Sequence, residues 1–89
     1  MRRMRSTAER LMYEEKFRKG TKVRIADRVF LEHFAATWKF HHKLQPEQIA
    51  YADGAAEVEK VGYYHGGDVL YWLLDIPGVW HETCLRPPR

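Results

Sequence analysis

Hydrophobic and polar positions alternate over residues 21–26, where Val23 and Ile25 fall on one side and basic residues on the other. A period of two is typical of a β-strand with one buried face. The sequence therefore predicts a first strand here that presents one side to a core.

The alternation stops over residues 27–53, which read as a helical insert. The apolar residues Phe30, Leu31, Phe34 and Trp38 recur at the spacing of one helical face. Asp27 is suited to cap this helix, because its carboxylate can accept from a backbone N–H of the first turn. Pro46 suits the first position of a second short helix, and Asp53-Gly54 is a turn signal.

Alternation returns after residue 54. Val58 and Val61 cannot share one face of a regular strand, so we expect a bulge near Glu59-Lys60. The paired glycines of His65–Asp68 tolerate positive φ and predict a hairpin connection.

The strongest strand pattern is Val69–Ile76, with apolar residues on both faces. Pro77-Gly78 has the residues that a type II turn requires, so we expect the chain to turn there. A short strand over residues 79–82 and a last extended piece around Leu85 complete the prediction.

The N-terminus predicts a separate basic helical leader over residues 1–19. Ser6 and Glu9 have the spacing of a capping box, and Gly20 stands where a left-handed residue would end a helix. Residues 1–20 hold seven Lys or Arg against three Glu, whereas residues 21–89 hold eight against nine acidic residues. The net charge of +3 therefore belongs to the leader, and the body of the chain is nearly neutral.

Length and composition exclude several classes of protein. Eighty-nine residues make one small domain, and Cys84 as the single cysteine excludes a disulfide scaffold. No apolar run reaches membrane-spanning length, and no apolar stretch follows the basic N-terminus as in a signal peptide. We expect a soluble, cytoplasmic protein with no membrane partner.

One strand, a helical excursion and several short strands joined by tight turns suit a small, strongly bent antiparallel barrel. The order resembles the SH3-like barrel over residues 20–86, through Gly20–Ile25 at its start and Val79–Leu85 at its close. Among such barrels it is most similar to bacterial accessory chains, such as the β chain of nitrile hydratase and the variable chain of ferredoxin–thioredoxin reductase. The resemblance implies a mainly β SH3-like barrel over residues 20–89, with the helical insert between its first two strands, and an accessory or binding role. It implies no site residue and neither nitrile nor redox chemistry.

Candidate chemistry is sparse. Ser6 is the only serine and is suited to helix capping, while Cys84, with His81 three residues before it, is of a type more often buried than reactive. We therefore expect no enzyme and no cofactor. The histidines are His33, His41, His42, His65 and His81. With Cys84, Glu82 and Asp68 they leave a metal-binding domain open as an alternative, although their spacing matches no zinc motif.

Aromatic residues are in surplus for so small a core. One interpretation is structural: Trp72 packs the barrel and Trp38 anchors the insert. The other is an aromatic groove between the long loop and the hairpin, which would dock an extended or Pro-rich peptide. Its candidate residues are Tyr63, Tyr64, His65, Tyr71 and Trp80. The sequence thus predicts a non-catalytic protein-interaction or accessory domain with a protein or peptide partner. A nucleic-acid-binding barrel that uses the basic leader as an arm stays open.

Overall fold

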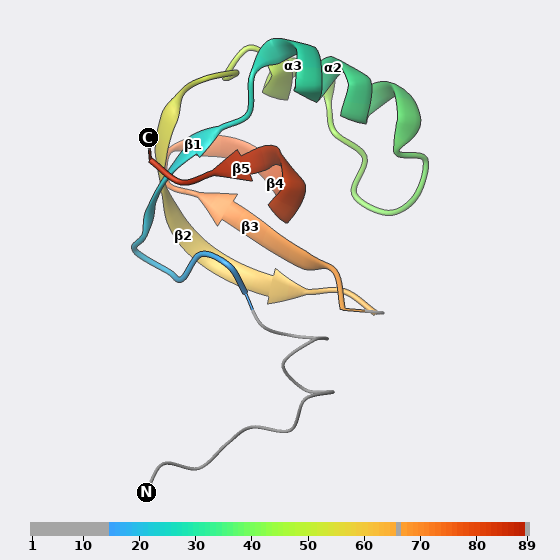
Figure 1. Cartoon of the computed structure of the whole chain (residues 1–89). Coiled ribbons are helices and arrows are strands. Elements are labelled where there is room, and N and C mark those ends of the chain that lie inside the picture. The colour runs from blue at the N-terminus through green and yellow to red at the C-terminus, as the bar shows by residue number, and fades with distance from the viewer. Residues whose placement is uncertain (1–14, 66, 89) are drawn as a thin grey trace, which may run out of the picture.

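A five-stranded antiparallel sheet in the order β4-β3-β2-β1-β5 curls into a half-barrel (Figure 1). This computed structural model describes residues 15–65 and 67–88. The strands are β1 (Lys22–Ile25), β2 (Ala55–Tyr63), β3 (Val69–Leu73), β4 (Ile76–His81) and β5 (Leu85–Arg86). Two helices, α2 (Arg28–Thr37) and α3 (Pro46–Ile49), separate β1 from β2, and a single 3₁₀ turn (Glu82–Cys84) joins β4 to β5. Among the described residues, no helix is long and apolar enough to cross a membrane.

The first strand and the insert follow their sequence signals. Val23 and Ile25 of β1 are buried, whereas the basic residues beside them are exposed. Asp27 caps α2, because its carboxylate accepts from the Phe30 N–H at 2.8 Å. Pro46 begins α3 as its fixed φ favours. The mainly β fold with a helical insert between the first two strands is therefore confirmed.

The predicted N-terminal helix falls mostly outside the described residues. Its described part, residues 15–19, consists of bends and a turn rather than a helix. Gly20 does take a positive φ of 88°, but within the turn that leads into β1. Its backbone N–H donates to Val58 O at 2.7 Å, so this glycine brings the chain onto the sheet.

The first hairpin has the predicted irregularity and connection. The pairing of β2 with β3 shifts register between Val58 and Lys60, which is the expected bulge. Beyond the last strand pair, the Tyr64 N–H donates to Asp68 O at 2.8 Å and closes the hairpin. This hairpin loop contacts the insert, because Asp68 Oδ2 lies 2.7 Å from His41 Nε2.

The turn between β3 and β4 lies at a different place from the one that the sequence predicts. The chain turns at Leu74-Asp75, where Asp75 takes a φ of 62° that aspartate tolerates better than most residues. Pro77 and Gly78 instead lie within β4, where its pairing with β3 is irregular. Proline has no N–H to donate and is confined in sheets to edge strands and bulges, and β4 is an edge strand. The chain therefore reverses at Leu74-Asp75 and not, as predicted, at Pro77-Gly78, although Gly78 does take the positive φ of 93° on which that prediction was based.

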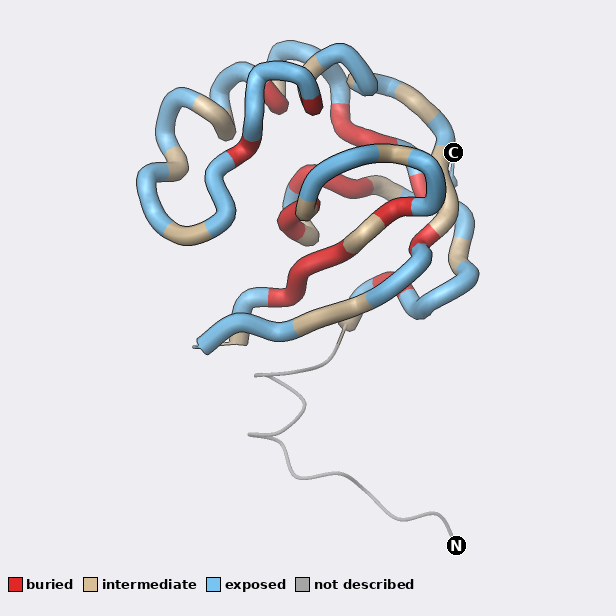
Figure 2. Tube along the Cα trace, turned by 180° about the vertical axis from the view of Figure 1, so that it is seen from behind, coloured by how far each residue is buried: buried red, intermediate tan, exposed pale blue. Residues whose placement is uncertain are grey.

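The core lies inside the curl of the sheet, where Figure 2 shows the buried stretches of the strands gathered. Tyr71 and Trp80 are cross-strand partners, and both are 0% exposed. Trp72, one residue along β3, points to the other face and is only partly buried. There its ring lies against Gly62, where a Cβ would come within 2.8 Å of it, and under Lys60 Nζ at 4.7 Å. Trp80 rather than Trp72 is thus the central tryptophan of the core.

Candidate functional site

The loop that follows α2 meets the β2–β3 hairpin at one end of the half-barrel. Side chains from that loop, from the hairpin and from the end of β4 come together there. We call this group the imidazole–aromatic cluster, and it consists of Trp38, His41, His42, Tyr64, Asp68 and His81.

Hydrogen bonds run through the cluster from one imidazole to the next. His41 Nε2 lies 2.7 Å from Asp68 Oδ2, and His41 Nδ1 lies 2.8 Å from His42 Nδ1. The backbone carbonyl of His42 accepts from His81 Nε2 at 2.8 Å. The insert loop is thus tied to both the hairpin and β4 by polar contacts.

Ring stacking supports the same contacts. The His41 ring lies parallel to the Tyr64 ring, with centroids 3.7 Å apart and planes 15° apart. Trp38 stacks on Phe34 of α2, and its ring centroid is 4.9 Å from that of His81. The Trp38 indole N–H donates to His41 O at 2.7 Å, so the ring is fixed at its polar edge as well.

A pocket of about 200 Å³ opens beside the cluster. Two aromatic side chains, Phe34 and Trp38, contribute apolar surface to its lining. Asp68, His81 and Glu82 contribute polar surface. Pockets for whole small ligands usually measure about 300–1,000 Å³, so this one has the size for a single side chain.

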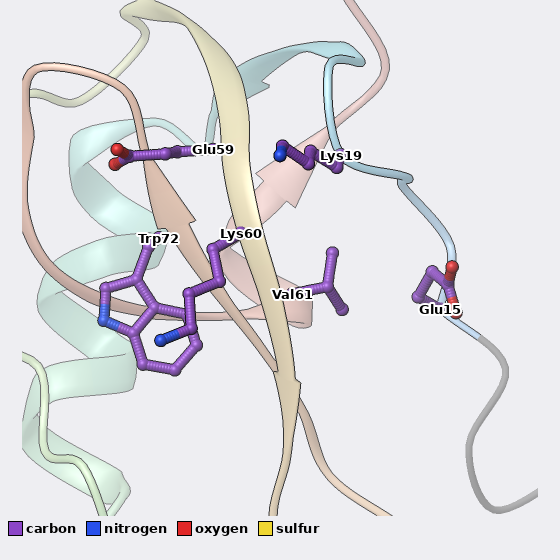
Figure 3. A pocket seen from close by; sticks show the side chains of 6 residues that line it. All are labelled: Glu15, Lys19, Glu59, Lys60, Val61 and Trp72. Carbon is purple, nitrogen blue, oxygen red and sulfur yellow. The ribbon is translucent and has the colours of Figure 1, made fainter.

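A larger concavity, of about 660 Å³, lies along β2, between Trp72 of β3 and the segment that holds Glu15 and Lys19 (Figure 3). Figure 3 shows the side chains of Trp72 and Lys60 on one side of β2 and those of Val61 and Glu15 on the other. They do not converge on a common point, and the Lys60 ammonium already covers the Trp72 ring. This surface is therefore a weaker candidate than the cluster.

Tyr71 anchors the start of the described chain. Its hydroxyl donates to Glu82 Oε2 at 2.5 Å and accepts from the backbone N–H groups of Lys16 and Phe17 at 3.1 and 3.2 Å. Burial, reinforced by the bond to Glu82, raises the pKa of Tyr71, so the phenol stays protonated. The role of Tyr71 is structural.

Cys84 is fully buried, and burial raises the pKa of its thiol to about 12. A protonated, buried thiol is a poor nucleophile at neutral pH. Within residues 15–65 and 67–88, no three His, Cys, Asp or Glu side chains are arranged to hold a metal ion. The metal-binding alternative therefore has no donor set in this part of the chain.

The five residues predicted to form an aromatic groove do not share a surface. Tyr71 and Trp80 are in the core, so a partner cannot contact them there. Tyr63 is exposed, and its hydroxyl donates to Glu15 Oε1 at 2.7 Å. Tyr64 lies in the cluster, and the exposed His65 contacts the Tyr64 ring.

The sequence predicts a groove between the long loop and the hairpin, but most of the residues that lie there are not among its five candidates. It indicates His41, His42 and Asp68 only as possible metal ligands and Trp38 only as an anchor of the insert. Adjacent histidines after an aromatic helical face are the signal that could have found them. Their partner Asp68 is 27 residues from His41, a distance that only the fold closes.

We expect His81 to make the fold sensitive to acid. Its side chain is 5% exposed, and burial lowers its pKa. Below about pH 6.5 the unfolded chain binds a proton that the folded His81 resists, so stability falls with pH by at most about 1.4 kcal/mol per pH unit. Urea unfolding at pH 7 and pH 5 should show a fall about 1 kcal/mol smaller in His81→Gln than in the wild type. The exposed control His33→Gln should retain the full fall, and an equal fall in both variants would contradict the prediction.

The cluster thus combines stacked rings, shared protons and a side-chain-sized pocket at the meeting point of three segments of the chain. Comparisons of the chain with protein-family models, with curated proteins and with solved structures found no match.

Proposed function

We propose that the chain is a small SH3-like barrel that acts as a non-catalytic protein-interaction or accessory module. Its binding surface is the imidazole–aromatic cluster with the adjoining pocket, and its partner is an extended or Pro-rich segment of another protein. The strand order, with a long insert after the first strand and a hairpin facing it, supports the proposed fold. A groove between such a loop and hairpin is a recognised docking place for extended peptides.

The observation that carries the proposal is the aromatic surface around the pocket. Phe40 is 68% exposed and packs edge-on against Trp38, with ring centroids 5.0 Å apart. Tyr64 is 37% exposed on the hairpin side. Exposed aromatic side chains beside a small pocket are typical of the anchor points of protein interfaces.

The polar groups of the pocket disfavour nucleic acid at this place. Asp68 and Glu82 both line it, and a phosphate would be repelled by their carboxylates. Phe34 and Trp38 instead offer apolar surface to an aliphatic or proline side chain. A protein segment therefore fits the surface better than a phosphodiester backbone.

The test is selection from a displayed library of random peptides, followed by mapping of the selected peptide on backbone amide spectra. We expect shifts at Trp38, Tyr64 and Asp68, and Tyr64→Ala should weaken binding at least about tenfold, as loss of an interface anchor does. Tyr51→Ala is the matched control, since Tyr51 is equally exposed at 37% but follows α3. Shifts confined to the Trp72 face would contradict the proposal. Salt-sensitive binding of an oligonucleotide instead of a peptide would favour the nucleic-acid alternative.

A further inference from the structure

The pocket beside the imidazole–aromatic cluster is lined by hydrogen-bond donors that the protein already uses. The Trp38 indole N–H and the Gly67 backbone N–H each donate to a backbone carbonyl, at 2.7 and 3.1 Å. His81 Nε2 lies 2.8 Å from the carbonyl oxygen of His42, and because a carbonyl can only accept, this nitrogen carries the hydrogen. These three groups therefore have no hydrogen left to offer a ligand.

Two carboxylates line the same pocket, and each has one oxygen that the described protein groups do not use. Asp68 Oδ2 is held by His41 Nε2 at 2.7 Å, and Glu82 Oε2 accepts from the Tyr71 hydroxyl and the Lys16 N–H. Within residues 15–65 and 67–88, no group donates to Asp68 Oδ1 or to Glu82 Oε1. The described lining residues include no Lys or Arg, so a ligand meets negative charge without a compensating cation.

His81 adds a third acceptor to the pocket. Its side chain is 5% exposed, and burial lowers its pKa, so the ring is neutral at pH 7. With the hydrogen on Nε2, the Nδ1 atom carries the lone pair. Among the described residues no group is bonded to Nδ1, and no buried side-chain nitrogen or oxygen there lacks a partner. Nδ1 is therefore not sealed in the core, and it is reached from the pocket that His81 lines.

The apolar part of the lining suits a long side chain with a charged end. Phe34 and Trp38 stack on each other, with ring centroids 5.6 Å apart, and the buried Val69 lies beside them in the lining. Methylene groups pack on such a surface, and a cation is attracted to the faces of aromatic rings. The volume of about 200 Å³ accommodates one side chain of this kind.

These features favour one chemistry over the others. A carboxylate or phosphate would be repelled by the two carboxylates, and a neutral aliphatic side chain would displace water from three acceptors without replacing its hydrogen bonds. A guanidinium brings five N–H donors in one plane and stays charged at physiological pH, so it serves several acceptors at once. An ammonium has three donors on a more strongly hydrated charge and matches the pocket less well.

We propose that this pocket takes an arginine side chain of the partner segment, with its guanidinium paired to Asp68 and Glu82 and its methylene groups on Phe34 and Trp38. His81 Nδ1 accepts a further N–H of the guanidinium. This inference rests on the proposed function, because it names the side chain that anchors the extended segment at the same surface.

The experiment titrates four capped peptides of the form acetyl-Ala-Pro-Xaa-Pro-Ala-amide into the free protein, with arginine, citrulline, lysine or leucine at the central position. Citrulline has the shape of arginine without its charge. The arginine peptide should shift the Trp38 indole N–H and the amides of Gly67 and Asp68. It should bind at least about tenfold more tightly than the citrulline and leucine peptides, because charge-assisted hydrogen bonds are about twice as strong as neutral ones. The lysine peptide should fall between them.

Two variants each remove one carboxylate of the pocket. Glu82→Gln and Asp68→Asn should each weaken binding of the arginine peptide at least about fivefold and change that of the leucine peptide less than about twofold. Both amides keep an oxygen that can accept the present bonds from Tyr71 or His41, and the amide spectrum of each free variant checks the fold. Glu59→Gln is the matched control. Glu59 is exposed and lines the other concavity, so this variant should bind the arginine peptide as the wild type does.

Two results would overturn the arginine pocket and leave the proposed function standing: equal binding of the arginine and leucine peptides at the cluster, or an arginine peptide that all three variants weaken alike. A lysine peptide that binds more tightly than the arginine peptide would also contradict it. If none of the four peptides shifts the cluster, the arginine pocket is wrong as well. The peptides selected from the random library then decide separately whether the cluster binds protein segments.

Discussion

Replacing Trp80 with alanine is expected to destabilise the fold by about 3–5 kcal/mol, the usual loss for a large aromatic residue removed from a core. Trp80 is 0% exposed and pairs across the sheet with Tyr71, so the cavity would lie at the centre of the half-barrel. Small domains are stable by only about 5–15 kcal/mol in total. Urea unfolding followed by far-ultraviolet circular dichroism would therefore show a large shift of the midpoint, or a chain already partly unfolded in buffer.

Trp72→Ala is the control for this prediction. Trp72 is a neighbour in space on β3, but its ring lies on the outer face over Gly62 and is only partly buried. We expect its loss to cost less than half as much as that of Trp80. A larger loss of stability in Trp72→Ala than in Trp80→Ala would show that Trp72 is the core tryptophan. A Trp80→Ala protein as stable as the wild type would show that the Trp80 ring lies at the surface.

Gly78→Ala is expected to lower the free energy of unfolding by about 2–5 kcal/mol. This loss combines the strain of alanine at a positive φ with the cost of a buried amide that loses its hydrogen-bond partners. Gly78 has a φ of 93°, and a Cβ there would lie 2.6 Å from Gln48 Nε2. Gln48 is 1% exposed and is bonded at both ends of its amide, to Val79 O at 3.1 Å and to the Gln45 N–H at 2.8 Å. The side chain cannot move aside without leaving these groups unpaired.

Gly20→Ala is the control that measures the backbone strain without a contact to Gln48. Gly20 has nearly the same φ, 88°, but nothing lies within 4 Å of the position its Cβ would take. Its replacement should cost only the backbone strain, about 1–2 kcal/mol. The difference between the two variants in urea unfolding then measures the contact of Gly78 with Gln48. Equal losses would mean that Gln48 adjusts freely and that α3 is not fastened to β4 through this amide.

The bond between Gln48 and β4 also fastens α3 to an edge of the sheet. β4 is an edge strand, and unpaired edges invite association with other chains. Gln48 of α3 donates to the carbonyl of Val79 on β4, so a side chain takes the place that a neighbouring strand would have. The insert therefore has a structural task in addition to carrying the loop of the candidate site.

The sequence by itself determined the features that depend on near neighbours in the chain. The alternation around Val23 and Ile25, the cap at Asp27, the helix start at Pro46 and the bulge after Val58 all arise within a few residues. Local sterics and local hydrogen bonds decide such features, so a short pattern is enough to predict them. The mainly β fold with a helical insert followed from their order.

Tertiary structure decided which of several locally acceptable options was used. Turns were possible at both Leu74-Asp75 and Pro77-Gly78, and the pairing of Leu73 with Ile76 selected the first. Period-two alternation puts Tyr71 and Trp72 on opposite faces, but only the curl of the sheet shows which face is inside. The cluster depends most on the fold, because His42 and His81 meet across 39 residues and no local pattern encodes such a contact.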